Sequence, residues 1–454
     1  MPALAAWEEV FLFDWRTGVV LSTTGGTAHS GTPASTLTTQ DNNGLTNYLT
    51  GTTVFPIFRT TTTTPTAAHG GNGILAGAIA ATASNVFGVP VTNRPVFNSG
   101  QEVRQFNKAI GTPVPTGGVG YNFGRGTLNP STSYEFDADY RTLVPFLWSF
   151  FQKGAVQTAA GTSAADYLYS FICPTDASPE MFAQLAMHRT ADPTKSYLIS
   201  DAVATSMRLS AAENDPLKAS FDFMGRMLDY SFDTTATALG YNGTSYAGVK
   251  FPEKNPFYWQ NSRVYLGNQA ADDISVTSYL VTAAQSFDLS VSASVKPLRY
   301  NNKFPIGYLY TGFNISGSLA IPWSAATVGS TYLQSRLQRN DDPNETLVAP
   351  IPINITWVGN ADGDFDTHYA GASVSTADMA SVLSFGDDDT TFTNDEGDMS
   401  ISVSGVPSSV VDQGDDEVII NLSLIGADTR ISNAISFNAC KIQIYEETAV
   451  YAIP

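Results

Sequence analysis

Histidine and cysteine have the widest catalytic and metal-binding chemistry of all side chains, and both are rare in this sequence. The four histidines could act as general bases or metal ligands, but none is part of an HxxxH or HExxH motif. The two cysteines form no CxxC pair and no disulfide framework. We therefore expect surface histidines and two separate buried thiols. These residues are His29, His69, His188 and His368, with Cys173 and Cys440.

One acidic passage has a spacing that could bind calcium. In NADGDFD, oxygen-bearing side chains recur at alternate positions from Asn360 to Asp366, and Ca²⁺ prefers such ligands. The helix–loop–helix calcium motif also needs glycine at its sixth position and glutamate at its twelfth, where this sequence has Phe365 and Gly371. That motif is therefore absent. We expect a solvated acidic loop, and a looser calcium site stays open as an alternative.

A second pair of carboxylates, Asp137 and Asp139, has the composition of a glycosidase site. Glycoside hydrolysis needs two carboxylates that converge across a sugar. Residues two apart on a strand share a face, and the alternation with Phe136 and Ala138 assigns both carboxylates to the solvent side. Ordinary surface charge is the expectation for this pair.

Motifs for nucleophilic catalysis and phosphate binding are missing. The sequence has no GxSxG and no GxxxxGK[ST], and its glycine-rich passage GGVGYNFGRG lacks the lysine and the helical pattern that a phosphate loop needs. We therefore predict no catalytic residue, no cofactor and no metal ligand, in a protein that is not an enzyme.

Composition restricts the possible partners. The chain has 454 residues, more than one hydrophobic core usually organises, so two domains are expected and three stay open as an alternative. Its 42 acidic residues against 23 basic ones give a net charge of −19, which disfavours binding to nucleic acid and anionic membranes. The N-terminus has no signal-peptide pattern, and the longest apolar run, residues 74–83, has about half the length of a membrane span. We expect a soluble protein made in a cytoplasm.

Hydrophobic periodicity predicts the elements that would position any site in the first half. Residues 7–22 alternate as two short strands around a turn at residues 17 and 18. Residues 133–140 alternate as a half-buried strand, and residues 142–151 follow helical spacing. Further strands are predicted in DYLYSFIC, DAVATSMRLSA and LKASFDFMG, the last two joined by the turn AENDP.

The second half repeats this pattern of one helix within a set of strands. GFNISGSLAIPW, residues 312–323, alternates as a strand, and a helical stripe through Leu333 and Leu337 follows it. Other strands are predicted in SFDLSVSASVKPL, PIPINITWVG, EVIINLSLIG and CKIQIYEETAVY. We interpret the two halves as a tandem duplication with modules in residues 1–250 and 251–454. A Thr/Gly-rich extension of about residues 22–73 belongs to the first module, and an acidic insertion of about residues 360–400 interrupts the second.

Three segments are similar to one known family. FNISGSLAIPW, followed by a short amphipathic helix, resembles the [FV]-x-[VI]-[ST]-G-S-[LF]-x-[VI]-x-W segment of tail tube proteins from long-tailed (siphovirus-like) bacteriophages. YEFDADYRTLVPFLWSFFQKG looks like the matching segment of a first copy, and SYLISDAVATSMRLSAAENDPLKASFDFMGR resembles the paired strands that follow it in such proteins. The resemblance covers about residues 130–450 and leaves the extension and the acidic insertion unmatched.

The resemblance implies a mainly β fold with a few helices, in which two tandem tail-tube-like β-sandwich or barrel modules are each flanked by a helix. It implies a structural virion protein of stacked rings, trimeric and pseudo-hexameric for the two-module type, around a conduit for genome ejection. The implied partners are copies of the chain itself and other tail proteins such as tape measure and tail terminator. Viral DNA would pass through without specific binding, no membrane would be involved, and the protein would reside in the virion tail after assembly in the host cytoplasm.

Two alternatives stay open, one of them from another functional class. A capsid or head-decoration protein would also be β-rich, although a jelly-roll shell has eight strands per module and little helix. A β-rich carbohydrate-binding or hydrolytic protein could use the six tryptophans as sugar platforms, although Trp148 and Trp323 occupy expected packing positions. In the tail-tube interpretation, the acidic charge is expected to line the lumen, where it would let DNA slide.

Overall fold

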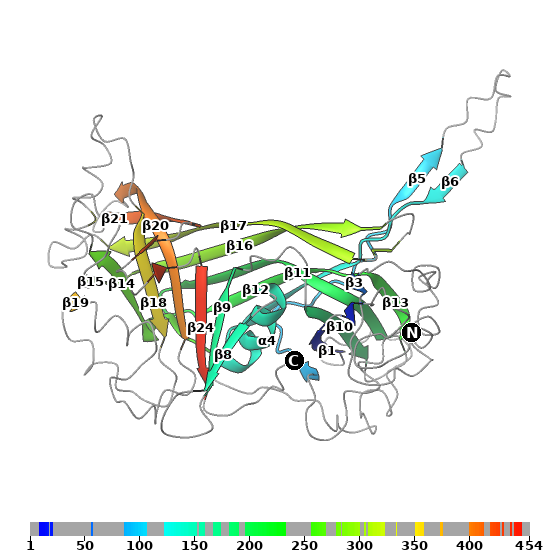
Figure 1. Cartoon of the computed structure of the whole chain (residues 1–454), viewed down its shortest axis with the longest axis horizontal. Helices are drawn as coiled ribbons and strands as arrows, with labels where there is room; N and C mark the ends of the chain where they lie inside the picture. Colours follow the sequence, from blue (N-terminus) through cyan, green and yellow to red (C-terminus); the bar gives the residue numbers. More distant parts are fainter. Residues whose placement is uncertain are drawn as a thin grey trace, which may run out of the picture.

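The protein folds mainly into β-strands, as predicted, and most strands belong to one curled antiparallel sheet (Figure 1). The computed structural model describes residues 9–17, 19–20, 56–57, 86–106, 122–151, 154–158, 167–173, 181–189, 196–232, 256–268, 278–282, 284–299, 304–305, 307–322, 333, 350–357, 373–375, 399–412, 418–426, 429–430, 436–437 and 440–446.

The elements follow one another along the chain with a single bounded α-helix among the described residues. In the N-terminal half they are β1 (Glu9–Thr17), β2 (Val19–Val20), β3 (Pro56–Ile57), β4 (Val86–Gly88), β5 (Val103–Phe106), β6 (Asn122–Arg125), β7 (Ser131–Asp137), α4 (Tyr140–Phe151), β8 (Gly154–Thr158), β9 (Tyr167–Ile172), β10 (Met181–Arg189), β11 (Ser196–Ala212), β12 (Lys218–Met224) and β13 (Met227–Phe232). In the C-terminal half they are the 3-10 turn η5 (Trp259–Asn261), β14 (Ser262–Asn268), β15 (Ser278–Thr282), β16 (Ser286–Leu298), β17 (Gly307–Pro322), β18 (Ile351–Trp357), β19 (Ser373–Ser375), β20 (Met399–Asp412), β21 (Val418–Ile425), β22 (Thr429–Arg430), β23 (Ser436–Phe437) and β24 (Cys440–Glu446).

The strand and helix predicted between residues 133 and 151 are confirmed as β7 and α4. Tyr134 and Phe136 of β7 are fully buried, and α4 turns Leu143, Phe146 and Phe150 into the same core. The alternation of period two therefore changes to helical spacing where the sequence indicated it. Each of these large side chains contributes roughly 1.5–3 kcal/mol of burial free energy, so the unit is firmly attached to the sheet.

Asp139 caps helix α4, and the expectation that it is surface charge is wrong. Its side chain is buried, its carboxylate accepts a hydrogen bond from the backbone N–H of Thr142 at 2.9 Å, and its carbonyl accepts one from Leu143 at 3.0 Å. An N-cap aspartate supplies the acceptor that amides of the first helical turn otherwise lack. Asp137 is partly exposed on β7 as expected. The strand ends at Asp137, so the two-residue period no longer applies to Asp139.

In the N-terminal half, β11 is the central strand of a series of antiparallel pairings. β12 and then β13 pair along one side of β11, β10 pairs along the other side, and β12 also pairs with β7. β10 continues the sheet to β1, and β1 to β4. The turn AENDP connects β11 and β12 as predicted, with Asn214 at a φ of 65°.

In the C-terminal half, β20 has the corresponding set of neighbours. β21 and then β24 pair along one side of β20, β18 pairs along the other side, and β21 also pairs with β17. β18 continues the sheet to β14, and β14 to β15. The pairings thus match with β20 in the place of β11 and β17 in the place of β7. The division into a module of residues 1–250 and one of residues 251–454 stays a prediction.

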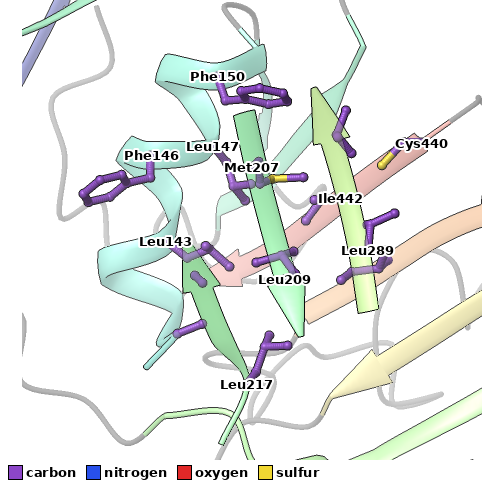
Figure 2. Packing of buried hydrophobic residues seen from close by; sticks show 14 of the residues in the cluster. Leu143, Phe146, Leu147, Phe150, Met207, Leu209, Leu217, Leu289, Cys440 and Ile442 are labelled. Atoms are coloured by element: carbon purple, nitrogen blue, oxygen red, sulfur yellow. The ribbon is translucent and has the colours of Figure 1, made fainter. Parts of the chain in front are cut away.

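The two halves share a sheet and a core. β11 pairs with β16, and β9 pairs with β24, so the sheet crosses between the halves twice. Figure 2 shows Leu147 of α4 beside Met207 of β11, with Leu289 of β16 and Ile442 of β24 in the same cluster. Within the described residues, the boundary near residue 250 therefore does not separate two hydrophobic cores.

Cys173 and Cys440 lie opposite each other at the β9–β24 junction, and both are free thiols as expected, but only Cys440 is buried. Cys173 follows Ile172, and Cys440 precedes Lys441, which is the residue paired with Ile172. Burial of Cys440, with a smaller contribution from Cys173, raises the pKa of Cys440 well above that of an ordinary thiol. The pairing of strands from opposite halves brings these two positions side by side, and spacing in the sequence gives no sign of it.

The remaining predicted strands are confirmed as β9, β11, β12, β16, β17, β18, β21 and β24. Residues 7–22 do contain two strands, but β1 pairs with β10 and β4 while β2 pairs with β3, so they form no hairpin with each other. Of the predicted second helix, only Leu333 is described, and it is helical and buried. The Thr/Gly-rich extension lies outside the described residues except for 56–57. The acidic insertion lies outside them except for 373–375 and 399–400.

Candidate functional site

Six neighbouring strands, three from each half, form a continuous part of the sheet in the order β7, β12, β11, β16, β17, β21. Their registers align alternate residues in rows across all six strands. One row runs through Glu135, Ser220, Arg208, Ser290 and Ser316 and ends at Ile425 of β21. Because strand side chains alternate between faces, these residues share the side opposite the hydrophobic core.

We call the solvent side of these six strands the serine face. Its polar side chains, about half of them serine, are exposed or partly exposed, and the apolar Ala320 and Ile425 lie on the same side. Its polar members are Ser133, Glu135 and Asp137 of β7, Lys218, Ser220 and Asp222 of β12, Ser206, Arg208 and Ser210 of β11, Asp288, Ser290 and Ser292 of β16, Asn314, Ser316 and Ser318 of β17, and Asn421 and Ser423 of β21.

The opposite side of the same strands explains why the serine face is held so regularly. Phe221 of β12, Met207 of β11, Leu289 of β16 and Leu319 of β17 are all fully buried. A slip of one residue in any strand would exchange its buried and exposed sets, which makes the register costly to change. The hydrophobic core therefore fixes which hydroxyls reach solvent.

The charges of the serine face are net negative. Arg208 donates to Asp288 twice, from Nε to Oδ1 at 3.1 Å and from Nη2 to Oδ2 at 2.5 Å. The hydrogen bond to Asp288, together with its charge, raises the pKa of Arg208, so this guanidinium stays protonated beside the carboxylate. The Ser206 hydroxyl donates to Asp222. The carboxylates of the face outnumber its cations, with Glu135, Asp137, Asp222 and Asp288 against Arg208 and Lys218.

This arrangement has a clear chemical consequence. A row of small hydroxyls beside an excess of carboxylates offers a polyanion few cations to bind and some repulsion. Such a face suits close passage of a polyanion better than its capture. The alternation of serine with apolar residues was visible in the sequence of β11, β16 and β17, but the side-by-side order of strands from the two halves was not.

The three tryptophans whose side chains the structure describes do not form sugar platforms. Trp148, Trp259 and Trp357 are 6%, 5% and 1% exposed, respectively. Trp148 packs edge-on against Phe171, and the rings of Trp259 and Trp357 lie 5.8 Å apart inside the core. Buried indoles have no face available for stacking on a carbohydrate, and packing is their role here.

The other chemically interesting residues do not gather in the part of the chain that the structure describes. No three His, Cys, Asp or Glu side chains there could hold a metal ion together. His29, His69, His368 and residues 360–366 lie outside the described residues, and His188 lies on β10 opposite Val10. Among the described helices, none has the length and apolar character needed to cross a membrane. No family model matches the chain, and no curated protein matches it either.

Proposed function

We propose that this chain is a structural, non-enzymatic subunit that assembles with copies of itself into stacked rings, forming the tail tube of a long-tailed phage. The tube would be the conduit through which the genome leaves the capsid. Its partners would be further copies of the chain and other tail proteins such as tape measure and tail terminator, in a virion tail assembled in the host cytoplasm. The work of the protein would then rest on its surfaces and require no reactive group.

The observation that carries this proposal is the matched set of strand pairings in the two halves. β7, β10, β11, β12 and β13 pair in the same order as β17, β18, β20, β21 and β24. A chain with two equivalent modules needs only three copies to build a ring of six. The segments that resemble tail tube proteins contain β11, β12 and parts of β7 and β17, which are members of this set, together with helix α4.

We further propose that the serine face lines the lumen of the tube. Duplex DNA carries about one negative charge per 1.7 Å of its axis, and each Lys or Arg that neutralises a phosphate tightens binding. On this face Arg208 is already paired with Asp288. The remaining charged side chains are one cation, Lys218, and three carboxylates. A lumen with this surface would hold the genome weakly and let it move.

Electron microscopy of the purified full-length chain tests the assembly. We expect hollow striated tubes, or rings with a mass of about three times 48.5 kDa, in negative stain and analytical ultracentrifugation. Closed shells would instead support a capsid role. Dispersed monomers at every concentration, or a monomer that binds oligosaccharides, would refute the proposal.

Basic substitutions on the serine face test the lumen assignment. Ser290 and Ser316 occupy adjacent strands in the middle of the face. Tubes of a Ser290→Lys, Ser316→Lys variant are expected to retain duplex DNA in a manner that weakens steeply with salt. Tubes of the neutral control, Ser290→Asn with Ser316→Asn, are expected to retain none. Equal DNA retention by the two kinds of tube would place the serine face outside the lumen.

A further inference from the structure

The two halves share a local irregularity that aligns them residue by residue. The β11–β12 register shifts at Thr205, whose hydroxyl donates to the carbonyl of Asp222 at 3.2 Å. The β20–β21 register shifts at Ser408, whose hydroxyl donates to the carbonyl of Asn421 at 3.0 Å. A bulge with the same hydroxyl–carbonyl bond in the equivalent hairpin makes Thr205 and Ser408 counterparts. Residues 206–209 then correspond to residues 409–412.

The matching segments of β11 and β20 differ in the number of strands that pair with them. Residues 206–212 of β11 pair with β12 on one side and with β16 on the other. On β20, residues 404 and 405 pair with both β18 and β21, so these two strands lie on opposite sides. β18 ends its pairing at Gly405, whereas β21 continues to Asp412. Among the described strands, none pairs with residues 409–412 on the β18 side.

The counterpart of β16 can be found in the N-terminal half. β16 pairs with β17, and β17 corresponds to β7. The counterpart of β16 is therefore the segment that lies beside β7 and beside the residues preceding β7. This segment is residues 92–102. Asn98 and Ser131 exchange two backbone hydrogen bonds of 2.9 Å, and Glu102 donates to the carbonyl of Thr127 at 3.1 Å. Alignment through β7 and β17 makes residues 96–102 the counterparts of residues 286–292. We call residues 96–102 the leading strand.

The leading strand also has an outer edge with no described strand against it. Its Val96 is 74% exposed, which makes it the most exposed of the large hydrophobic side chains that the structure describes as exposed. The sheet runs from the leading strand through β7, β12, β11, β16, β17 and β21 to β20. Residues 96–102 and 409–412 are therefore the two opposite edges of one sheet.

We propose that residues 409–412 of one chain pair with the leading strand of a second copy of this chain, in the way that β11 pairs with β16 inside each chain. The alignment places Ser409 opposite Glu102 and Asp412 opposite Ser99, so no two carboxylates face each other. Each edge supplies the backbone donors and acceptors that the other edge needs. Because the two edges differ, the contact is head-to-tail and can close into a ring. Only the number of chains in that ring rests on the proposed function.

Engineered disulfides test this contact in the full-length chain. The double variant Ser409→Cys with Glu102→Cys is oxidised mildly and analysed on a non-reducing gel. We expect covalent dimers and trimers that disappear on reduction, and monomer alone from either single variant. Ser206→Cys with Ser292→Cys, at the equivalent junction within the chain, is expected to close a disulfide without any increase in mass. Tubes or rings that form normally while the double variant stays monomeric on the gel would overturn the proposal.

A second variant checks the same edge without cysteine. Gln101 is exposed and lies opposite Val410 in this alignment. Gln101→Pro removes a backbone N–H within the paired segment and is expected to reduce self-association at least tenfold in sedimentation, while circular dichroism and the unfolding midpoint stay unchanged. Gln101→Ala keeps the N–H and is expected to associate normally. Unchanged association of Gln101→Pro would contradict the contact. Crosslinked rings without any tubes would sustain the contact and refute the tail-tube function, so the two proposals fail separately.

Discussion

Gly317 is the position where one added methyl group reports most directly on how β16 and β17 approach each other. It lies opposite Leu289, and a Cβ built on it would lie 2.0 Å from the carbonyl oxygen of Asp288 and 3.1 Å from the Cα of Leu289. Gly312 on the same strand is a matched control, because a Cβ there would meet no atom within 4 Å. Gly317→Ala and Gly312→Ala thus make the same chemical change in two different environments.

The magnitude follows from that separation. Ordinary contact begins at 3.4 Å, so the Asp288 carbonyl must move from 2.0 to 3.4 Å, a shift of about 1.4 Å. Such a shift strains at least one ladder hydrogen bond, worth about 1 kcal/mol, in addition to about 1–3 kcal/mol for overpacking. We expect Gly317→Ala to lower the free energy of unfolding by about 2–4 kcal/mol. Gly312→Ala restricts the unfolded chain and is expected to leave it unchanged or raise it by about 0.5 kcal/mol.

Urea denaturation followed by tryptophan fluorescence measures both variants, since Trp259 and Trp357 lie in the core beside these strands. The free energies are compared at equal slopes of the unfolding transition, because a changed slope signals a changed native or denatured state. A difference below about 0.5 kcal/mol between the variants would refute the close approach of β16 and β17. The register that builds the serine face would then be wrong as well.

Three further predictions concern individual side chains. Asp139→Ala should lower the free energy of unfolding by about 1 kcal/mol because the N–H of Thr142 loses its acceptor, whereas Asp139→Asn keeps an acceptor oxygen and should stay close to the wild type; equal losses in urea denaturation would contradict the capping role. A double-mutant cycle with Arg208→Ala and Asp288→Ala should give a coupling energy below about 1 kcal/mol, because the Arg208 side chain is 61% exposed. This coupling energy should decrease at high salt. A coupling energy that salt does not alter would contradict an exposed ion pair between these two residues. Cys440 should react with a thiol reagent near pH 8 far more slowly in the native than in the urea-unfolded protein, because its raised pKa leaves little thiolate. Its native reaction rate should increase as the pH rises. Equal native and unfolded rates, measured by mass spectrometry of the labelled peptide, would place this thiol outside the core.

The elements that the sequence predicted correctly are those whose signal is local. The alternation in β16 and β17 and the change from period two to helical spacing between β7 and α4 depend only on neighbouring residues. The same locality produced the error at Asp139, where the strand period was extended two residues beyond the end of the strand. An aspartate three residues before a helical amide is also a capping signal, and it would have found the correct role.

The candidate site was only partly predictable. Serine or aspartate at every second position from Ser286 to Ser294 of β16 already determines that this face of the strand is small and polar, because strand geometry sends successive side chains to opposite sides. The sequence determined the strands, one helix, the acidic charge and the polar faces. The tertiary structure alone decided that β11 lies beside β16, that Cys173 meets Cys440, and that polar faces from both halves form one surface. Pairing between distant strands depends on the free energy of the whole core, so no local window of residues contains it.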